Sequence, residues 1–189
     1  MLVLASRSPR RSRLLEDAGI PFVVRPAATV DESLHRHERP ENYVTRVAEA
    51  KAQAVEADRN EIILGADTTV VIGGHILGKP AGREDAVRML EMLSGRRHEV
   101  LTGICLRFRG QVLRDWAVTS VWFAELSLQE IEEYAASGEP LDKAGAYAIQ
   151  GLASKFIEKI DGDYSNVVGL PVSMVYRHLR AIESTEGRR

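Results

Sequence analysis

The sequence lacks the residues and motifs that mark redox, metal-cluster and membrane proteins. Its single cysteine, Cys105, excludes an intrachain disulfide and a cysteine-based metal cluster. The apolar surroundings of that residue, LTGICLRF, favour a buried structural thiol over a nucleophile. No apolar run approaches the ~20 residues of a membrane span, and the start MLVLASR is too short an apolar run for a signal peptide. We therefore expect a soluble, cytoplasmic protein.

Common nucleotide-binding and metal-binding motifs are also missing. There is no GxGxxG after a strand and no GxxxxGK[ST], so neither a dinucleotide-binding fold nor a P-loop is indicated. The formal net charge of −2 gives no global field that would attract nucleic acid or an acidic membrane, so any basic site must be local. The histidines have no metal-ligand spacing beyond His35 and His37, which lie in a polar stretch and are expected to be solvated.

What the sequence does contain is enough for a folded core. At 189 residues with 44% hydrophobic content, the chain fits one domain, or one domain with two lobes. No internal repeat is visible. We assign residues 1–183 to a single domain and residues 184–189 to a polar tail.

Strand and helix patterns alternate along the chain. Strand patterns cover residues 2–5, 22–25, 61–77, 99–124 and 155–160. The pattern over 61–77 has a polar interruption at Asp67 and a turn at Gly73-Gly74, and the pattern over 99–124 is a hairpin around RGQ. Helices are expected at residues 9–18, 40–57, 83–93, 127–138 with a Ser127/Glu130 capping box, and 171–183. The hairpins break the pattern of a purely parallel sheet. A mixed α/β fold follows.

The segment LASRSPRR joins the first strand to the first helix through a serine-rich turn. Such a turn presents free backbone N–H groups and the positive end of the helix dipole to one point. Arg10 and Arg11 fall in the first helical turn, where basic side chains are unfavourable for that dipole. Either water solvates them, or they bind an anion such as phosphate, whose oxygens match the forked guanidinium.

Two further charged residues interrupt apolar patterns. Lys51 lies on the buried stripe of the second helix, one turn from Val47 and Val55, and either snorkels to the edge or meets an anion in a cleft. Asp67 lies in the apolar run ILGADTTVV, where an unpartnered carboxylate would cost several kcal/mol. It is either a structural Asx turn at a break in the strand or a group that holds a metal or activates water.

Two loops complete the candidates. The segment LGKPAG places Lys79 on a loop that glycine and proline stiffen. Residues 139–151, EPLDKAGAYAIQG, have little periodicity, and long ordered loops are typical of functional sites. Asp142 and Lys143 could simply pair with each other, and Gln150 could equally be a surface side chain. The spacing does not decide between these alternatives.

These segments, together with VDES, AEAKA, LSGRRHEVLTGI and GDYSNVVGLP, resemble in order the signature segments of the Maf (septum-formation-inhibitor-like) family. The resemblance covers the chain from residue 2 to about residue 180. The family comprises nucleoside triphosphate pyrophosphatases related in fold to the inosine triphosphate pyrophosphatases. The resemblance therefore implies a mixed twisted sheet flanked by helices, with a cleft between two lobes.

The resemblance also implies a reaction, in which a nucleoside triphosphate and water give the monophosphate and pyrophosphate with the help of Mg²⁺ or Mn²⁺. Asp67 would accept the proton of the attacking water and share metal binding with Glu32. Lys51 and Lys79 would hold the triphosphate. The role of Glu32 depends on the resemblance alone, because the residue otherwise looks like an ordinary loop acid.

The resemblance also implies which residues bind phosphate and which select the base. Ser6, Arg10 and Arg11 would grip phosphate. The segment DKAGAYAIQG resembles the branch that hydrolyses dTTP and UTP, with Arg10, Thr68 and Gln150 as specificity positions. A glutamine amide suits uracil or thymine, because it accepts from N3–H and donates to a ring carbonyl. It could also flip to suit cytosine, so it discriminates only where neighbours lock its orientation.

A second function remains open, a nucleotide-sensing regulator of cell division in which catalysis is incidental. The presence of both acids, Glu32 and Asp67, favours the enzyme, since binding a triphosphate would not need carboxylates near its phosphates. The expected partner is a small-molecule nucleotide, with no nucleic acid and no membrane, and a homodimer is a family-based expectation. Arg7 departs from the family pattern, in which many relatives have a small residue at the mouth of the phosphate site.

Overall fold

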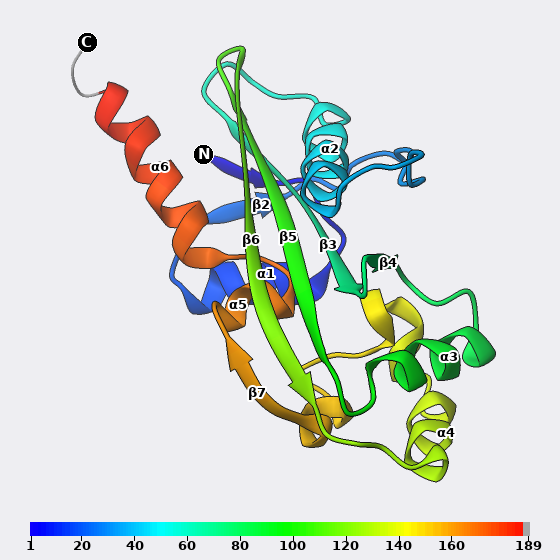
Figure 1. Cartoon of the computed structure of the whole chain (residues 1–189). Coiled ribbons are helices and arrows are strands. Elements are labelled where there is room, and N and C mark those ends of the chain that lie inside the picture. The colour runs from blue at the N-terminus through cyan, green and yellow to red at the C-terminus, as the bar shows by residue number, and fades with distance from the viewer. Residues whose placement is uncertain (187–189) are drawn as a thin grey trace.

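The computed structural model describes residues 1–186, in which a seven-stranded mixed sheet carries helices on both faces (Figure 1). The strands are β1 (Leu2–Leu4), β2 (Phe22–Val24), β3 (Ile62–Ile72), β4 (His75–Leu77), β5 (Arg97–Phe108), β6 (Gln111–Phe123) and β7 (Ile157–Asp161). The helices are α1 (Pro9–Asp17), α2 (Pro40–Gln53), α3 (Arg83–Leu93), α4 (Leu128–Ala136), α5 (Tyr164–Val168) and α6 (Val172–Glu186). Three 3-10 turns follow α4, namely η1 (Glu139–Asp142), η2 (Ala144–Ala146) and η3 (Leu152–Phe156).

The strand order is β2-β1-β3-β5-β6-β7, and β4 pairs with β3 outside this path. β1 runs parallel to both β2 and β3, whereas every other pairing is antiparallel. The expected mixed α/β class is therefore confirmed. The parallel pairs arise because connections through α1 and α2 bring the chain back to the starting end of β1 before each new strand, on either side of β1.

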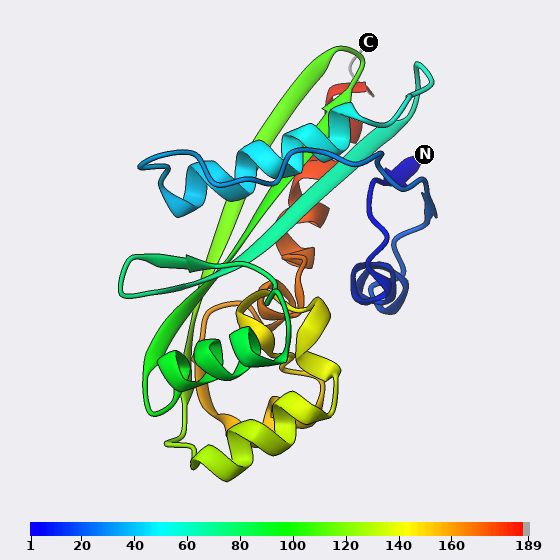
Figure 2. The ribbon, with the colours of Figure 1, turned by 90° about the vertical axis from the view of Figure 1, so that its right-hand side faces the viewer.

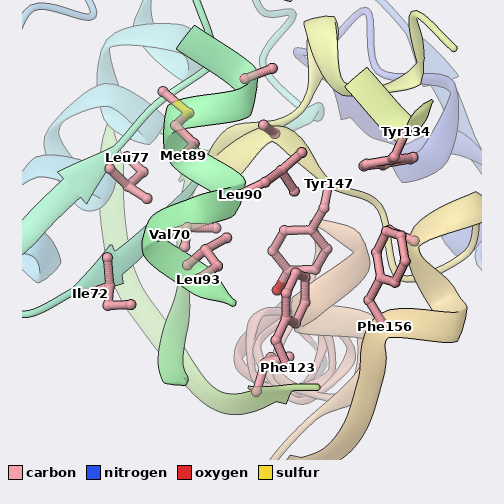
Figure 3. Packing of buried hydrophobic residues seen from close by; sticks show 14 of the residues in the cluster. Val70, Ile72, Leu77, Met89, Leu90, Leu93, Phe123, Tyr134, Tyr147 and Phe156 are labelled. Carbon is pink, nitrogen blue, oxygen red and sulfur yellow. The ribbon is translucent and has the colours of Figure 1, made fainter. Parts of the chain in front are cut away.

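The hydrophobic core lies in separate clusters around the sheet. On one face α2 packs against β1, β3 and β5, and on the other face α1 and α6 pack against the same strands. A larger cluster joins α3, α4 and the 3-10 turns to the far ends of the long strands (Figure 3). Figure 2 shows α2 crossing the long strands and α3 and α4 gathered at their other end. Apolar contacts thus form two lobes that share one sheet.

Two glycines allow α2 to lie directly on the sheet. A Cβ atom on Gly65 of β3 would lie 2.1 Å from the carbonyl oxygen of Ala48, and one on Gly103 of β5 would lie 2.4 Å from the carbonyl carbon of Val44. Both distances are shorter than any real contact, so these positions need the absence of a side chain. The close approach sets the height of Lys51, in the last turn of α2, above β3.

Local sequence signals hold well for turns and helix starts. Both bonds of the capping box between Ser127 and Glu130 are present at the start of α4. Arg109 and Gly110 form the expected hairpin turn between β5 and β6, both with positive φ. Cys105 is fully buried, as its apolar surroundings predict.

Several predicted boundaries are wrong. β3 runs without interruption through Asp67, so neither the break in the strand nor the Asx turn exists. The strand continues because the carboxylate finds a cationic partner across the sheet surface. Helix α2 ends at Gln53, before the expected end near residue 57. The short helix α5 was not predicted, and α6 continues to Glu186, through the first part of the expected polar tail. Residues 187–189 of that tail lie outside the described residues.

Within the described residues, no helix is both long and apolar enough to cross a membrane.

Candidate active site

A cavity of about 740 Å³ opens between the β1–α1 turn, α2, β3 and the chain after α4. The side chains that the sequence singled out all line it, although they come from segments spread over the whole chain: Ser6, Arg10, Arg11, Glu32, Lys51, Asp67, Thr68, Lys79 and Gln150. The individual roles of these residues stay predictions. Those roles require that the side chains share one cavity, and they do.

The floor of the cavity holds an ammonium between two carboxylates. Lys51 Nζ lies 2.7 Å from Asp67 Oδ1 and 2.8 Å from Glu32 Oε1. The lysine side chain is 15% exposed and that of Asp67 is 10% exposed, whereas Glu32 is half exposed on its loop. Lys51 therefore does not snorkel out to bulk water. Its stripe position on α2 directs the ammonium inward onto β3, where it neutralises a buried acid.

Burial dominates the protonation behaviour of Asp67. Desolvation raises the pKa of this carboxyl above its usual value, while the neighbouring charges of Lys51 and Arg11 oppose the increase. Within the described residues, its one hydrogen bond is the bond that Lys51 donates to Oδ1. Oδ2 is thus available to a water molecule. A carboxylate with a raised pKa and a free oxygen is suited to holding a water and accepting its proton.

Arg11 is buried, and protein groups bind its guanidinium. Nε donates to Gly169 O at 2.8 Å, and Nη1 donates to Ala66 O at 2.9 Å. Nη1 and Nη2 also donate to Ser6 Oγ at 3.2 Å and Thr68 Oγ1 at 3.1 Å, respectively. The alternative of a solvated arginine does not hold for this residue. Arg11 joins the β1–α1 turn to β3 and to the loop before α6, and it adds a positive charge to the cavity wall.

Arg10 and the chain after α4 meet through ion pairs at the rim. Arg10 Nη1 lies 3.3 Å from Asp142 Oδ2, and Asp142 also pairs with its neighbour Lys143. The Asp142–Lys143 pair is one of the alternatives that the sequence left open. Two cations that line the cavity therefore share a single, largely exposed acid, which an incoming anionic ligand could replace.

Lys79 and Gln150 occupy exposed positions on the cavity wall. Neither side chain has a hydrogen bond or ion pair with the residues that the structure describes. Thr68 differs, because its hydroxyl accepts from Arg11 and lies 2.9 Å from Thr102 Oγ1. Lys79 and Gln150 are therefore free to contact a ligand, while Thr68 is held within the protein.

The sequence alone did not identify Asn166, a buried residue that is connected to Thr68 through Thr102. Asn166 is fully buried, and its Nδ2 donates to Val100 O at 3.0 Å and to Thr119 Oγ1 at 2.9 Å. Its backbone carbonyl accepts from Thr102 Oγ1 at 3.2 Å. The amide in the segment YSNVVGLP, next to apolar residues, is the signal that could have indicated it.

The carboxylates that line the cavity fit a metal ion that also binds the substrate. Within the described part of the chain, no cluster of three or more His, Cys, Asp or Glu side chains could hold a metal. In the cavity, Glu32 and Asp67 converge on Lys51. Mg²⁺ is commonly bound by one or two carboxylates together with substrate phosphates and waters. The pair therefore fits an ion that binds together with a polyphosphate.

The fold and the cavity define an α/β protein in which basic side chains and two carboxylates line one shared site. Comparison with known sequences gives the family. The chain belongs to the Maf-like protein family, whose sequence profile matches residues 1–182.

Named relatives align over nearly the whole chain. A dTTP/UTP pyrophosphatase of Anaeromyxobacter sp. (strain Fw109-5) is 54% identical over 184 residues, covering 95% of this chain and 88% of that protein. One from Koribacter versatilis (strain Ellin345) is 50% identical over 180 residues, with coverage of 95% and 93%. One from Bacillus anthracis is 46% identical over 180 residues, with coverage of 95% and 94%.

Proposed function

We propose that this protein is a nucleoside triphosphate pyrophosphatase that hydrolyses dTTP and UTP to the monophosphate and pyrophosphate. One observation carries the proposal, namely that Asp67, Glu32 and Lys51 meet in a cavity whose other walls carry cations. The relatives named dTTP/UTP pyrophosphatase support both the reaction and the substrate class. A regulator that only bound nucleotide would not need the buried acid.

Phosphate recognition is an electrostatic task. A nucleoside triphosphate carries about four negative charges and repels an attacking hydroxide, so the site must supply several cations. Arg10, Arg11, Lys51 and Lys79 line the cavity and are proposed to fulfil this role, with Ser6 on the β1–α1 turn. Arg11 contributes charge from within the wall, whereas Lys79 has a free ammonium for direct contact.

Water activation is assigned to Asp67. A water held at Oδ2 attacks the α-phosphorus, and the carboxylate takes its proton while the bond to the bridging oxygen breaks and pyrophosphate leaves. Burial supports this role, because it raises the pKa of the carboxyl and makes it a better base. Lys51 opposes the rise in the pKa of the carboxyl and holds the group in place.

A divalent cation completes the proposal. Glu32 and Asp67 would hold Mg²⁺ or Mn²⁺, which would neutralise phosphate charge and polarise the attacked phosphorus. The carboxylate pair on Lys51 supports this assignment, since both acids already face one cation.

Base selection is assigned to Gln150 at the opposite wall. Its exposed amide can accept from N3–H of uracil or thymine and donate to a ring carbonyl. Arg10 and Thr68 are the other proposed specificity positions. The hydroxyl of Thr68 is held by Arg11, so this residue would act through shape and through its position beside the base or sugar.

The test is pyrophosphate release from a panel of nucleoside triphosphates with Mg²⁺. We expect turnover of dTTP and UTP, with one pyrophosphate for each monophosphate, and slower turnover of CTP, ATP and GTP. Saturable binding of dTTP without pyrophosphate release from any member of the panel would favour the nucleotide-sensing regulator instead.

We extend the proposal to the setting of the reaction. The enzyme would act in the cytoplasm as a housecleaning activity that limits surplus or damaged pyrimidine nucleotides, and it would form a homodimer. These points follow from the resemblance, and light scattering on the purified protein tests the dimer.

A further inference from the structure

The segment from residue 139 to residue 152 leaves α4, lines the cavity and closes on itself through one carboxylate. Glu139 Oε1 accepts from the Tyr134 hydroxyl at 2.9 Å, and Oε2 accepts from the backbone N–H of Leu152 at 3.0 Å. The two ends of the 139–152 segment are therefore joined by a single side chain. Tyr134 lies on α4, is buried, and packs edge-on against Phe156, so the anchor itself is fixed (Figure 3).

The carboxylate also touches the backbone next to Gln150. A Cβ atom on Gly151 would lie 2.2 Å from Glu139 Oε1, so a side chain at this position would have to displace the carboxylate. The φ of Gly151 is −105°, so the backbone conformation itself does not require glycine. The Glu139 carboxylate thus packs against Gly151, and its bond to Leu152 N–H holds the backbone two residues after Gln150.

Other contacts fix the middle of the 139–152 segment, and Glu139 holds its last part together with Tyr134, which contacts the backbone of Ala148. The N–H of Gly145 donates to Gly78 O at 3.0 Å, and Tyr147 Oη lies 2.8 Å from His98 Nε2. Beyond Tyr147, a bond from Gly151 N to Ala148 O forms a local turn. In the described structure the Gln150 side chain itself has no hydrogen bond. Its position therefore follows from the backbone on which it is carried.

We propose that Glu139 is a positioning residue for base selection, which holds the backbone beside Gln150 so that the amide presents one orientation to a pyrimidine. The inference rests on the proposed function and deepens it. A glutamine amide that could move freely would accept either uracil or cytosine, because flipping exchanges its donor and acceptor. The link through Glu139 to Leu152 and Tyr134 would hold the backbone that carries Gln150, and so limit the positions from which the amide can meet a base.

The test compares UTP with CTP, which differ in the hydrogen-bonding groups at N3 and C4 that the amide would read. We expect Glu139→Ala to lower the ratio of kcat/KM for UTP over CTP about tenfold, mainly through a higher KM for UTP. Glu139→Gln should keep the ratio within about twofold, since its amide can accept from Leu152 N–H and donate to the Tyr134 oxygen. Glu132→Ala removes an exposed acid of α4 outside the cavity and serves as the matched control.

A double-mutant cycle shows whether Glu139 acts through Gln150. In a Gln150→Ala background, Glu139→Ala should change the ratio no further, because the amide that it positions is gone. An unchanged ratio in Glu139→Ala, a Glu139→Gln variant as impaired as Glu139→Ala, or a full additional loss in the double variant would each overturn the positioning role. If Glu139→Ala does not fold, Tyr134→Phe carries the test, because it removes the bond between the Tyr134 hydroxyl and Glu139 together with the contact to the Ala148 backbone. A lower ratio is expected, and an unchanged ratio would overturn the positioning role.

The failure of the proposed function has a different signature. A wild-type protein that hydrolyses neither UTP nor CTP would overturn the function itself. A wild type that prefers UTP, with a preference that survives Glu139→Ala, overturns only the inference about Glu139.

Discussion

The two walls of the cavity are built in different ways. The wall with Asp67 and Lys51 consists of regular structure, a central strand and a helix, and its charged groups are largely buried and paired with one another. The wall with Gln150 consists of 3-10 turns, with Gly145 and Ala146 at positive φ, and its end is held by hydrogen bonds of individual side chains. The first wall is suited to chemistry that tolerates little displacement, and the second to selection that can vary without disturbing the fold.

This difference predicts how each wall responds to substitution. Changes at the strand-and-helix wall should affect the chemical step, since the proposed mechanism assigns its groups to the attacking water and the phosphates. Changes at the wall of 3-10 turns should affect KM and the choice of base. The following substitutions test the contrast, from the largest expected effect to the smallest.

Asp67→Asn should have the largest effect. The amide keeps the shape of the side chain but cannot accept a proton, so we expect kcat for dTTP to fall about 10³-fold while nucleotide binding survives. Steady-state kinetics and calorimetric binding measure the two quantities. Asp161→Asn on β7, an exposed acid outside the cavity, is the control. Turnover at the wild-type rate would remove Asp67 from the mechanism.

Lys51→Met should lower kcat/KM about 10²-fold and also change its pH dependence. Lys51 opposes the rise that burial causes in the pKa of Asp67. Without the ammonium that pKa rises further, so the base is protonated over a wider acidic range. The acidic limb of the kcat/KM profile should therefore move to higher pH. An acidic limb at the wild-type pH would show that Asp67 is not the titrating base.

His98 couples the wall of 3-10 turns to the stability of the fold. Burial lowers the pKa of His98 from 6.5 to about 4, so the unfolded chain binds a proton in this range that the folded protein does not. The free energy of unfolding therefore has its full value with respect to His98 above pH 6.5. It decreases by about 3 kcal/mol as the pH falls toward 4. Urea unfolding of wild type and His98→Phe between pH 7 and 4 measures this, and the variant should lose less stability over the range. Parallel pH profiles for the two proteins would contradict the assignment.

Arg7→Ala should have the smallest effect. Arg7 is exposed at the mouth of the cavity, and within the described residues it has no hydrogen bond or ion pair. A free cation at that position attracts an anionic nucleotide, so its loss should raise KM about threefold at low salt, with kcat unchanged and a smaller effect at high salt. Arg13→Ala, on α1 outside the cavity, is the control. A lower kcat with unchanged KM would place Arg7 in the chemical step instead.

The sequence predicted two kinds of feature: turns and caps that depend on neighbouring residues, and charged side chains whose burial costs free energy. The capping box of α4 and the hairpin turn depend on neighbouring residues, and Lys51 and Asp67 were noticeable because charges rarely interrupt buried patterns. The sequence left two alternatives open for each residue and did not pair them, because they lie on different elements that only the fold brings together. Glu32 carried no signal of its own, because a loop acid is ordinary until the fold brings it to Lys51.

Arg11 illustrates a different limit. Its first two acceptors are the backbone carbonyls of Gly169 and Ala66, and every residue has such a group, so no pattern of side chains indicates which ones will be used. Residues 139–151 were likewise expected to lack regular structure. The two short turns η1 and η2 form there, and the segment is held by contacts from Tyr134 and His98, which come from separate elements of the fold.

The two glycines beneath α2 tie the reaction rate to positions that carry no functional group. A methyl group at residue 65 or residue 103 would push the helix outward and carry the ammonium of Lys51 away from its acid. A screen for loss of turnover should therefore recover substitutions of these glycines as well as of the charged residues. The distance between α2 and the sheet leaves no room for a larger side chain at either position.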